Sequence, residues 1–440
     1  MMKREPINTA RPTAIAQKLL ALAVAGAASM PVLADPSDFH VYFRSGIGSS
    51  MDGGDQVCYK AGGAPAKYRL GNECETYAAV RLIKDQDVEG AGKFKITTEM
   101  IYETDQNTDW EQINGNTSSA DRIAIRRFNV AGTDVIESLP GATLWIGKEF
   151  VNRQDVHMND FFFWDPKGPG VGLSNVDVGF AKLGVSWVRN NSEDMTDGEG
   201  DKGNVVNNTY DIRLSGIALG EGKSLEVGVD IGTTSGTEDL AYEGKNNSGL
   251  LFTANLYQTN FLGGSNKLTI QKAKDGMIGE ASTGNQNGAN EGSLFRIIDQ
   301  GVTKLADNVE AQYVVIYQNK DDNAVYTDEA RGKSSTTYGY KWVSAGIRPV
   351  FYWSGYSSTA LELGIDKVDP KDDNYDSTSM TKLTVAQQFS SGQKFFARPA
   401  LRLFVTYAKW NENGNSNAGG VSPADATSGI SFGAQTEVWF

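Results

Sequence analysis

The chain has 440 residues, and 41 Lys and Arg stand against 54 Asp and Glu, so its formal net charge is −13 at pH 7. A chain this acidic is a poor candidate for holding a phosphate backbone, which argues against nucleic acid as a partner. Past residue 34, no uninterrupted apolar run approaches the ~20 residues that a spanning helix needs, so a helical membrane protein is excluded.

The first 34 residues contain the three parts of a secretory signal peptide. Basic residues precede an apolar stretch at 19–28, and small side chains follow, ending at Ala34. This order predicts export and cleavage after Ala34, with residues 1–34 as the signal and 35–440 as one mature domain. The alternative is an N-terminal anchor helix, but the apolar stretch is too short to cross a bilayer.

The chain has two cysteines, Cys58 and Cys74, with turn-forming residues 62–65 between them. In an exported chain this pair predicts one disulfide that closes a surface loop. A metal site needs more ligands than two cysteines and the distant His40 and His157 can offer. We therefore expect neither a metal nor another cofactor.

Short segments of alternating apolar and polar residues recur along the mature chain. The clearest are 39–45, 225–231, 401–408 and 432–440. In the first of them His40, Tyr42 and Arg44 share the polar face, as successive side chains of a strand point to opposite sides. Long polar stretches separate the alternating segments, at 190–208, 276–292, 366–379 and 411–428, and such lengths are unusual for a compact soluble domain.

The alternating segments fit two architectures. A soluble sandwich or propeller puts the apolar face inward, whereas an outer-membrane barrel puts it outward. Three features favour the barrel: an export signal without a later membrane helix, long polar stretches between aromatic-rich strands, and a terminal aromatic, Phe440, in an amphipathic strand. A closed barrel also leaves no unpaired backbone edge. At ~20–25 residues per strand and connection, the sequence predicts roughly 16–18 strands around an aqueous channel.

A set of short motifs spans the mature chain in order. They are FHVYFRSGIG at 39–48, KYRLGNECETY at 67–77, LPG at 139–141, RQDVHM at 153–158, FFFWD at 161–165, GPG at 168–170, GIRP at 346–349, RPA at 398–400, TYAKW at 406–410 and FGAQ at 432–435. Together they resemble the maltoporin family of sugar porins. The resemblance implies an 18-stranded antiparallel transmembrane β-barrel with an inward-folded constriction loop, assembled as a homotrimer in the outer membrane of a Gram-negative bacterium. It also implies facilitated diffusion of maltose and maltodextrins.

In that family, lumen aromatics bind the apolar faces of glucose rings, and polar groups opposite hydrogen-bond the hydroxyls, as a pyranose requires. The positions that the resemblance assigns to this aromatic ladder are Tyr42, Tyr77, Trp110, Phe396 and Trp439. Parity supports three of them, because Tyr42, Phe396 and Trp439 share strand faces with charged residues. Trp110 lies in a polar loop that the resemblance places in a neighbouring subunit's channel. The alternative for each is an aromatic at the membrane interface.

The resemblance also implies a polar track along the channel. Its positions are Arg44, Arg69, Arg126, Arg153, Asp155 and Asp160, with His157 between them. Arg126 has an adjacent arginine, Arg127. Residues 153–165 match the family's third external loop, which folds inward, and Phe162 takes the narrowest point. The alternative is that residues 161–164 form a buried strand.

Three positions depart from the family pattern. Phe162 stands where the family usually has Tyr, and Ala79 replaces a lumen carboxylate of the second strand. The family's mid-chain aromatic falls near residues 263–266, where no aromatic stands, although Phe261 could substitute for it. These departures affect the expected substrate range of the channel and not its expected fold.

Two other functions compete with a sugar channel. A general-diffusion porin shares the architecture and has a charge-lined constriction without an aromatic ladder. A secreted glycoside hydrolase needs two carboxylates ~5–10 Å apart, and Asp155 with Asp160 could be read as such a pair, but outward apolar faces do not fit a soluble enzyme. The sequence therefore predicts a channel and not an enzyme.

Overall fold

The computed structural model describes residues 38–90, 92–105, 122–196, 202–236, 248–279, 292–322, 325–328, 333–336, 339–411 and 426–440. The predicted signal peptide and Trp110 lie outside these residues. Within them, no helix has the length and apolar character needed to cross a bilayer.

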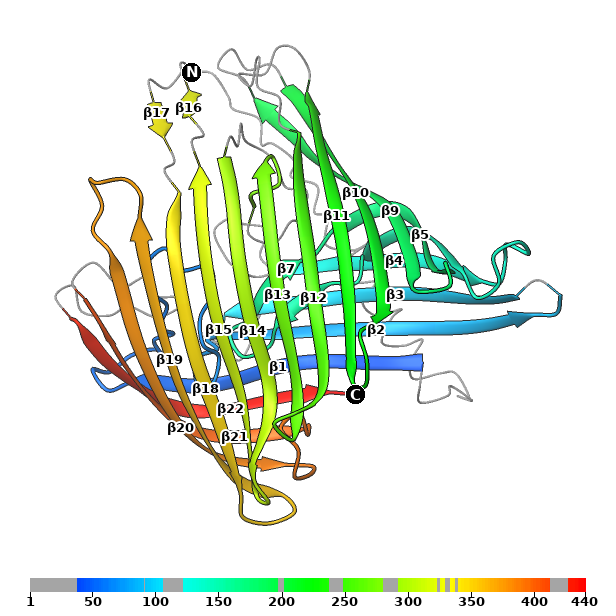
Figure 1. Ribbon diagram of the computed structural model, residues 1–440. Coiled ribbons are helices and arrows are strands. Elements are labelled where there is room, and N and C mark those ends of the chain that lie inside the picture. Colours follow the sequence, from blue (N-terminus) through cyan, green and yellow to red (C-terminus); the bar gives the residue numbers. More distant parts are fainter. Residues whose placement is uncertain are drawn as a thin grey trace, which may run out of the picture. The chain divides into compact units, whose positions relative to one another are not determined.

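Eighteen antiparallel strands form one closed sheet, which confirms the predicted barrel (Figure 1). In chain order they are β1 (Phe39–Ser50), β2 (Glu75–Val88), β3 (Gly92–Asp105), β4 (Arg122–Thr133), β5 (Thr143–Phe150), β8 (Lys167–Asp177), β9 (Lys182–Thr196), β10 (Lys202–Ala218), β11 (Lys223–Gly236), β12 (Gly249–Phe261), β13 (Gly264–Asp275), β14 (Gly292–Ala306), β15 (Val309–Asp322), β18 (Tyr340–Tyr352), β19 (Ser357–Pro370), β20 (Thr378–Ser390), β21 (Ala400–Trp410) and β22 (Ser428–Trp439). The sheet closes because β1 pairs with β2 on one side and with β22 on the other.

Two short hairpins stand apart from the barrel wall. β6 (Gln154–Val156) pairs with β7 (Phe161–Trp164), and β16 (Val325–Asp328) pairs with β17 (Lys333–Thr336). Two of the long polar stretches contain strand: residues 190–208 belong largely to β9 and β10, and residues 366–379 include the end of β19 and the start of β20. The expectation of loops at these positions is therefore wrong in part, because a strand does not need an apolar residue at every second position.

The wall strands alternate between buried inward and exposed outward side chains. In β21, Leu401, Leu403 and Val405 are 58%, 60% and 53% exposed, whereas Arg402 and Thr406 are buried. A soluble sandwich would bury its apolar face instead, so the alternation places the apolar surface on the outside of the barrel, where lipid tails satisfy it.

Loop 1, residues 51–74, folds into the barrel and packs on the inner wall. The Tyr68 ring lies against Gly346 and Gly364, where a Cβ would collide with it, and its hydroxyl is 2.8 Å from Ser344 Oγ. Farther along, the Gly71 backbone donates to the side chain of Gln435 at 3.1 Å. The two glycines on the wall therefore make room for an aromatic anchor of the loop.

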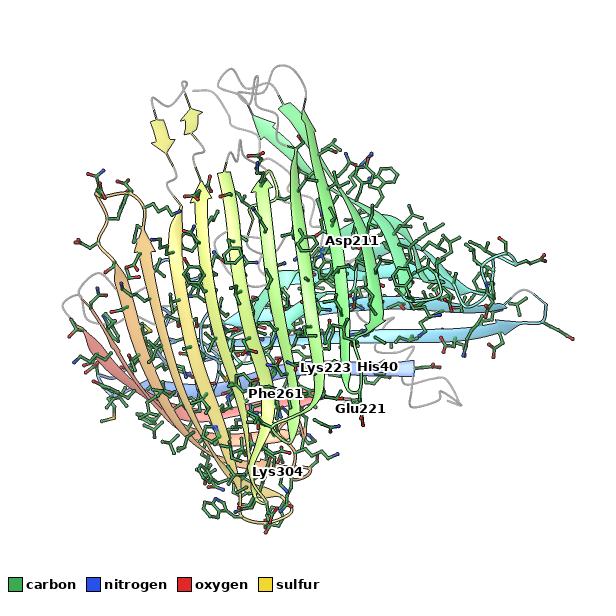
Figure 2. All side chains as sticks on the ribbon, in the orientation of Figure 1. His40, Asp211, Glu221, Lys223, Phe261 and Lys304 are labelled. Carbon is green, nitrogen blue, oxygen red and sulfur yellow. A yellow bond between two sulfur atoms is a disulfide. The ribbon has the colours of Figure 1, made fainter. Side chains whose placement is uncertain are left out.

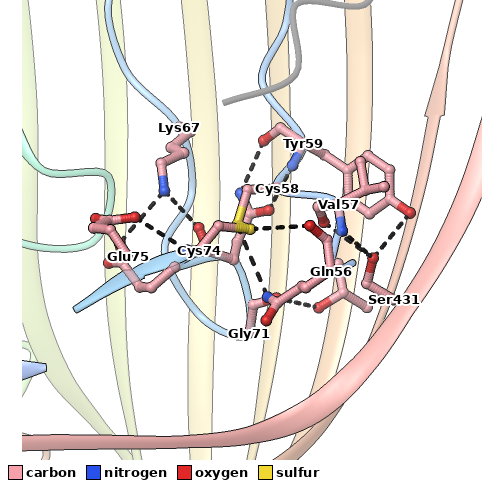
Figure 3. Close-up of a disulfide and its surroundings, with 12 residues drawn as sticks. Gln56, Val57, Cys58, Tyr59, Lys67, Gly71, Cys74, Glu75 and Ser431 are labelled. Carbon is pink, nitrogen blue, oxygen red and sulfur yellow. Dashed lines mark hydrogen bonds and ion pairs between the residues drawn. A yellow bond between two sulfur atoms is a disulfide. The ribbon is translucent and has the colours of Figure 1, made fainter. Parts of the chain in front are cut away.

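The predicted disulfide between Cys58 and Cys74 is confirmed, with an S–S length of 2.06 Å (Figure 3). The expectation of a surface loop around it is wrong, because Cys58 is fully buried. Loop 1 carries apolar side chains such as Val57 and Tyr59, and their burial against the inner wall is favourable in free energy because it removes apolar surface from water. Ser431 of β22 fixes that end of the loop by accepting the Val57 N–H at 3.2 Å.

The inward loop, residues 151–166, carries the β6–β7 hairpin and lies along the inner wall. Phe163 and Trp164 are fully buried, and the Trp164 Nε1 donates to both carboxylate oxygens of Asp230 on β11, at 3.1 and 3.2 Å. The Arg213 guanidinium of β10 lies 3.6 Å from the Trp164 ring centroid and donates to the Val151 carbonyl. The two readings of residues 161–164 therefore both hold in part: a short buried strand lies within an inward loop.

We expect the barrel to assemble without its disulfide. Cys58→Ser with Cys74→Ser removes a cross-link that chain-entropy arguments value at ~3 kcal/mol for a loop of ~15 residues, but the strand ladders do not depend on it. Hydrogen exchange should quicken in loop 1 and stay unchanged in β8 and β9, which serve as the internal control. Two free thiols in protein isolated from the envelope would contradict the bond.

Candidate functional site

Three aromatic predictions meet at the seam where the barrel closes. Trp439 lies opposite Tyr42 in register, and Tyr77 lies opposite Arg44. Directly paired residues project to one face of a sheet, and Arg44 reaches Asp160 of the inward loop at 3.5 Å, so this face is the lumen. The Tyr42 ring centroid is 6.2 Å from that of Trp439, with planes 15° apart, and 5.9 Å from that of Tyr77.

His157 extends this row of rings from the inward loop. Its ring centroid is 5.6 Å from that of Trp439 and 5.4 Å from that of Phe396. Burial lowers the pKa of His157 well below its usual range, and the neighbouring Arg69 lowers it further, while Glu437 raises it. The imidazole is therefore neutral at pH 7. Sequence reasoning placed His157 among the polar groups, and its Nδ1 does lie 3.4 Å from Arg69 Nη1, while its ring also belongs to the row of rings.

Phe396 reaches the lumen by a different route from the one that parity predicted. β21 begins at Ala400, and Phe396 lies in the turn before it, so strand parity does not apply there. Its contact with His157 and a 5.0 Å edge contact with Phe395 hold the ring beside the row. Trp110, the remaining ladder prediction, lies outside the described residues.

Arg44 and Arg69 of the predicted polar track lie beside the rings. Arg44 Nη2 is 2.6 Å from Glu75, and Arg69 donates to the Tyr42 hydroxyl at 2.6 Å. Glu73 lies between the two arginines and is buried. Burial alone would raise its pKa, but Arg44, Lys67 and Arg69 together hold the pKa of Glu73 below its usual range. These charges therefore remain ionised next to the aromatic surface.

A β-bulge in β4 explains how the adjacent Arg126 and Arg127 are arranged. Arg127 pairs with Glu99 on β3, and the next pair joins Ile125 to Met100, so Arg126 is the extra residue. A bulge lets two consecutive side chains face the same side. Arg126 donates to the Tyr77 hydroxyl at 3.1 Å and Arg127 lies 3.3 Å from Glu149, so both point into the barrel.

The inward loop turns its remaining predicted residues away from the wall. Arg153, Asp155, His157, Asp160 and Phe162 are half-buried, while the residues between them are mostly buried against the strands. Asp155 pairs with Phe162 in the hairpin, and the Arg153 guanidinium lies 4.4 Å from the Phe162 ring centroid. Burial raises the pKa of Asp155, an effect that Lys267 and Arg153 oppose.

Sequence reasoning missed Glu437 as a functional residue. Its carboxylate lies 3.3 Å from Arg69, 2.7 Å from Arg398 and 3.1 Å from Arg402, and it also accepts the Tyr42 hydroxyl. The available signal was its parity with Trp439, which put it on the lumen face. A carboxylate shared by three guanidinium groups fixes their positions under the aromatic row.

At the positions that depart from the family pattern, the expected polar group and the expected aromatic contact are missing among the described residues. Ala79 lies opposite Tyr42 and offers no hydrogen-bonding group. Phe261 lies at the end of β12, near the turn to β13 (Figure 2), and makes no ring contact with the residues that the structure describes. The row of rings therefore runs from Tyr77 to Phe396 without a mid-chain member among the described residues.

Comparison with known proteins identifies the family. A family model described as LamB porin matches residues 37–440. Among solved structures, OpdL of Pseudomonas aeruginosa is 10% identical, covering 91% of this chain and 98% of its own, with a TM-score of 0.45. The outer membrane channel DcaP of Acinetobacter baumannii is 11% identical, with coverages of 92% and 99% and a TM-score of 0.49. Wzi of Escherichia coli, described as a carbohydrate-binding β-barrel involved in capsule assembly, is 11% identical, with coverages of 98% and 90% and a TM-score of 0.43.

The family match covers the whole barrel, including both loops that fold into it. Small molecules pass through porins by way of the lumen, so the side chains gathered there belong to a transport path and not to a catalytic centre. The chain belongs to the LamB porin family and is a channel of the outer membrane of a Gram-negative bacterium.

Proposed function

We propose that this porin is selective for sugars and passes maltose and maltodextrins by facilitated diffusion. Tyr77, Tyr42, Trp439 and Phe396 would hold the apolar faces of successive glucose rings. The polar track of Arg44, Arg69, Arg126, Arg153, Asp155 and Asp160, with His157, would exchange hydrogen bonds with the hydroxyls. The family match supports a channel, and the sugar selectivity is the proposal.

One observation carries this proposal: four lumen aromatics and one imidazole form an unbroken row of ring contacts, each between 5.4 and 6.2 Å. Charged groups lie along it, within hydrogen-bond distance of the Tyr42 hydroxyl. Aromatic planes gain from contact with pyranose C–H faces, and the charged groups replace the water that hydroxyls lose. Several weak, similar positions let a solute leave as readily as it enters.

The proposal includes maturation and assembly. Cleavage after Ala34 would release the barrel domain, and three copies would form a homotrimer, with Trp110 reaching a neighbouring channel. Mass spectrometry of the envelope protein tests the cleavage, and the mobility of unheated protein in a denaturing gel tests the trimer.

The test of sugar selectivity is current block in a planar bilayer. Purified protein should conduct ions, and maltose through maltoheptaose should block that current in a saturable way, with affinity rising as the chain lengthens. The alternative is a general-diffusion porin with a charge-lined constriction, which the many arginines of the lumen favour. Conductance without any saturable block by maltodextrins would establish that alternative.

Two substitutions of Phe162 distinguish the effect of side-chain bulk from that of hydrogen bonding at the narrowest point of the proposed path. Phe162→Ala should raise ion conductance clearly, because it removes a ring that projects from the inward loop. Phe162→Tyr should leave conductance nearly unchanged and tighten sugar block by ~0.5–1.5 kcal/mol, the net value of one hydrogen bond. Unchanged conductance in correctly assembled Phe162→Ala protein would place the constriction elsewhere.

A further inference from the structure

Four cationic side chains converge on one buried ring, that of Phe150 at the end of β5. The Cζ atoms of Arg126, Arg127 and Arg153 lie 4.6, 4.8 and 4.8 Å from its centroid, and the Lys167 Nζ lies 6.0 Å away. They come from β4, the inward loop and β8. Cations that surround one ring are close enough to repel each other, so their positive charge must be balanced by carboxylates or by a ligand.

Carboxylates compensate only part of this charge. Arg127 lies 3.3 Å from Glu149 and 3.8 Å from Glu99, and Lys167 lies 2.7 Å from Asp165. Glu99 is shared, since it also pairs with Arg81 at 2.9 Å. Counting Arg81 with the four cations gives five positive charges against three negative ones, an excess of two.

The excess resides on Arg126 and Arg153. Among the residues that the structure describes, neither forms an ion pair with a carboxylate: Arg126 donates to the Tyr77 hydroxyl, and Arg153 stacks on Phe162 at 4.4 Å. Asp155 of the loop interacts electrostatically with Lys267 as well as with Arg153, and Asp165 interacts with Arg126 and Arg153 as well as with Lys167. Stacking on aromatic rings holds a guanidinium in place while leaving its in-plane N–H donors available.

These observations fix the chemistry of a ligand. A guanidinium presents a planar fork of donors that matches a tetrahedral oxyanion, and such charge-assisted hydrogen bonds are stronger than neutral ones. The low-dielectric walls of a narrow channel concentrate the positive potential. A neutral glucose ring can accept hydrogen bonds from these groups but carries no charge to balance the excess.

We propose that Arg126 and Arg153, with Arg127 and Lys167 beside them, form a subsite for a phosphate-type oxyanion, either free or carried by a sugar. The sugar-phosphate form rests on the proposed sugar channel, because the aromatic row would hold the ring while the subsite holds the phosphate. The free-anion form does not depend on it. Tyr77 joins the two, since its ring belongs to the row and its hydroxyl accepts from Arg126.

The experiment compares current block by glucose, glucose 6-phosphate and inorganic phosphate in a planar bilayer. Glucose 6-phosphate should bind about tenfold more tightly than glucose at ~0.1 M KCl, as charge-assisted hydrogen bonds allow. The preference should shrink at ~1 M KCl, where charges are screened within ~3 Å. Excess inorganic phosphate should compete with glucose 6-phosphate and not with glucose.

The double variant Arg127→Gln with Lys167→Gln removes charge and leaves the proposed polar track intact. It should lower the preference for glucose 6-phosphate several-fold. The single variant Arg127→Lys keeps both positive charges and should therefore retain most of the preference. Arg189→Gln is the matched control, since Arg189 is exposed on the outer face of β9 beside Trp187. An equal preference in the double variant and the wild type would overturn the proposal.

Two results separate this inference from the proposed function. Block by glucose 6-phosphate and inorganic phosphate without block by maltodextrins would keep the subsite and refute the maltodextrin channel. Block by maltodextrins with no preference for glucose 6-phosphate over glucose would do the reverse. Both comparisons use the wild-type barrel, so they remain decisive if a variant fails to assemble.

Discussion

Replacing Trp439 by Ala should weaken maltodextrin binding by ~1–3 kcal/mol, the scale of aromatic stacking on flat ligands, which is about 5- to 150-fold in affinity. Trp439 is central to the row of rings, because it contacts both Tyr42 and His157. The Arg398 guanidinium lies 4.0 Å from its ring centroid and holds it in place. Removing the indole therefore interrupts the row at its middle.

Sugar titrations of the single-channel current would measure this loss. Open-channel conductance should change little, because Trp439 lines the wall and not the inward loop. Trp187→Ala is the matched control: Trp187 is 38% exposed on the outer face of β9, stacked on Tyr210. Equal sugar block in wild type and Trp439→Ala would show that sugars do not follow the row of rings.

The largest loss of stability is expected from Trp164→Ala. Truncating a buried aromatic typically destabilises a protein by ~3–5 kcal/mol. Trp164 is fully buried, and its ring lies under Arg213 while its Nε1 donates to Asp230. Its loss leaves a cavity at the wall and deprives a buried carboxylate of a donor, so the inward loop should detach from β10 and β11.

Denaturant unfolding in detergent gives the free energy, and current noise reports the loosened loop. Trp164→Phe keeps most of the ring and should lose only the indole hydrogen bond, ~1–3 kcal/mol for a donor to a charged group. Phe162→Ala, two positions away, is the control, because Phe162 is half-buried on the opposite side of the hairpin. A loss below ~1 kcal/mol for Trp164→Ala would mean that the loop is anchored elsewhere.

Strand parity was the part of the structure that the sequence allowed us to predict well. Alternation in β1, β21 and β22 gave the correct inward and outward faces, because each of these strands separates an apolar exterior from a polar interior. The same rule does not apply at Phe396, since parity holds only within a strand and this residue precedes β21, where the contact with His157 positions its ring instead. It was also insufficient at Arg127, where a bulge that no alternation reveals brings a second guanidinium inward.

Loop packing was beyond the reach of local patterns. The burial of loop 1 depends on Gly346 and Gly364, which lie far away in the sequence and leave space for Tyr68. The role of Glu437 likewise depends on three arginines from different segments, and His157 joined the aromatic row only because the inward loop carries it there. Such long-range pairings require the three-dimensional structure.

The position of loop 1 constrains the order in which the barrel can be built. The loop follows the first strand, yet it is held by the last ones: Val57 hydrogen-bonds to Ser431, and the Gly71 carbonyl accepts from Thr406. These contacts need β21 and β22 in place, so loop 1 takes its final position only after the end of the chain has joined the sheet. The last strands to be made thus hold the first loop, and the filling of the interior belongs to the late stage of assembly.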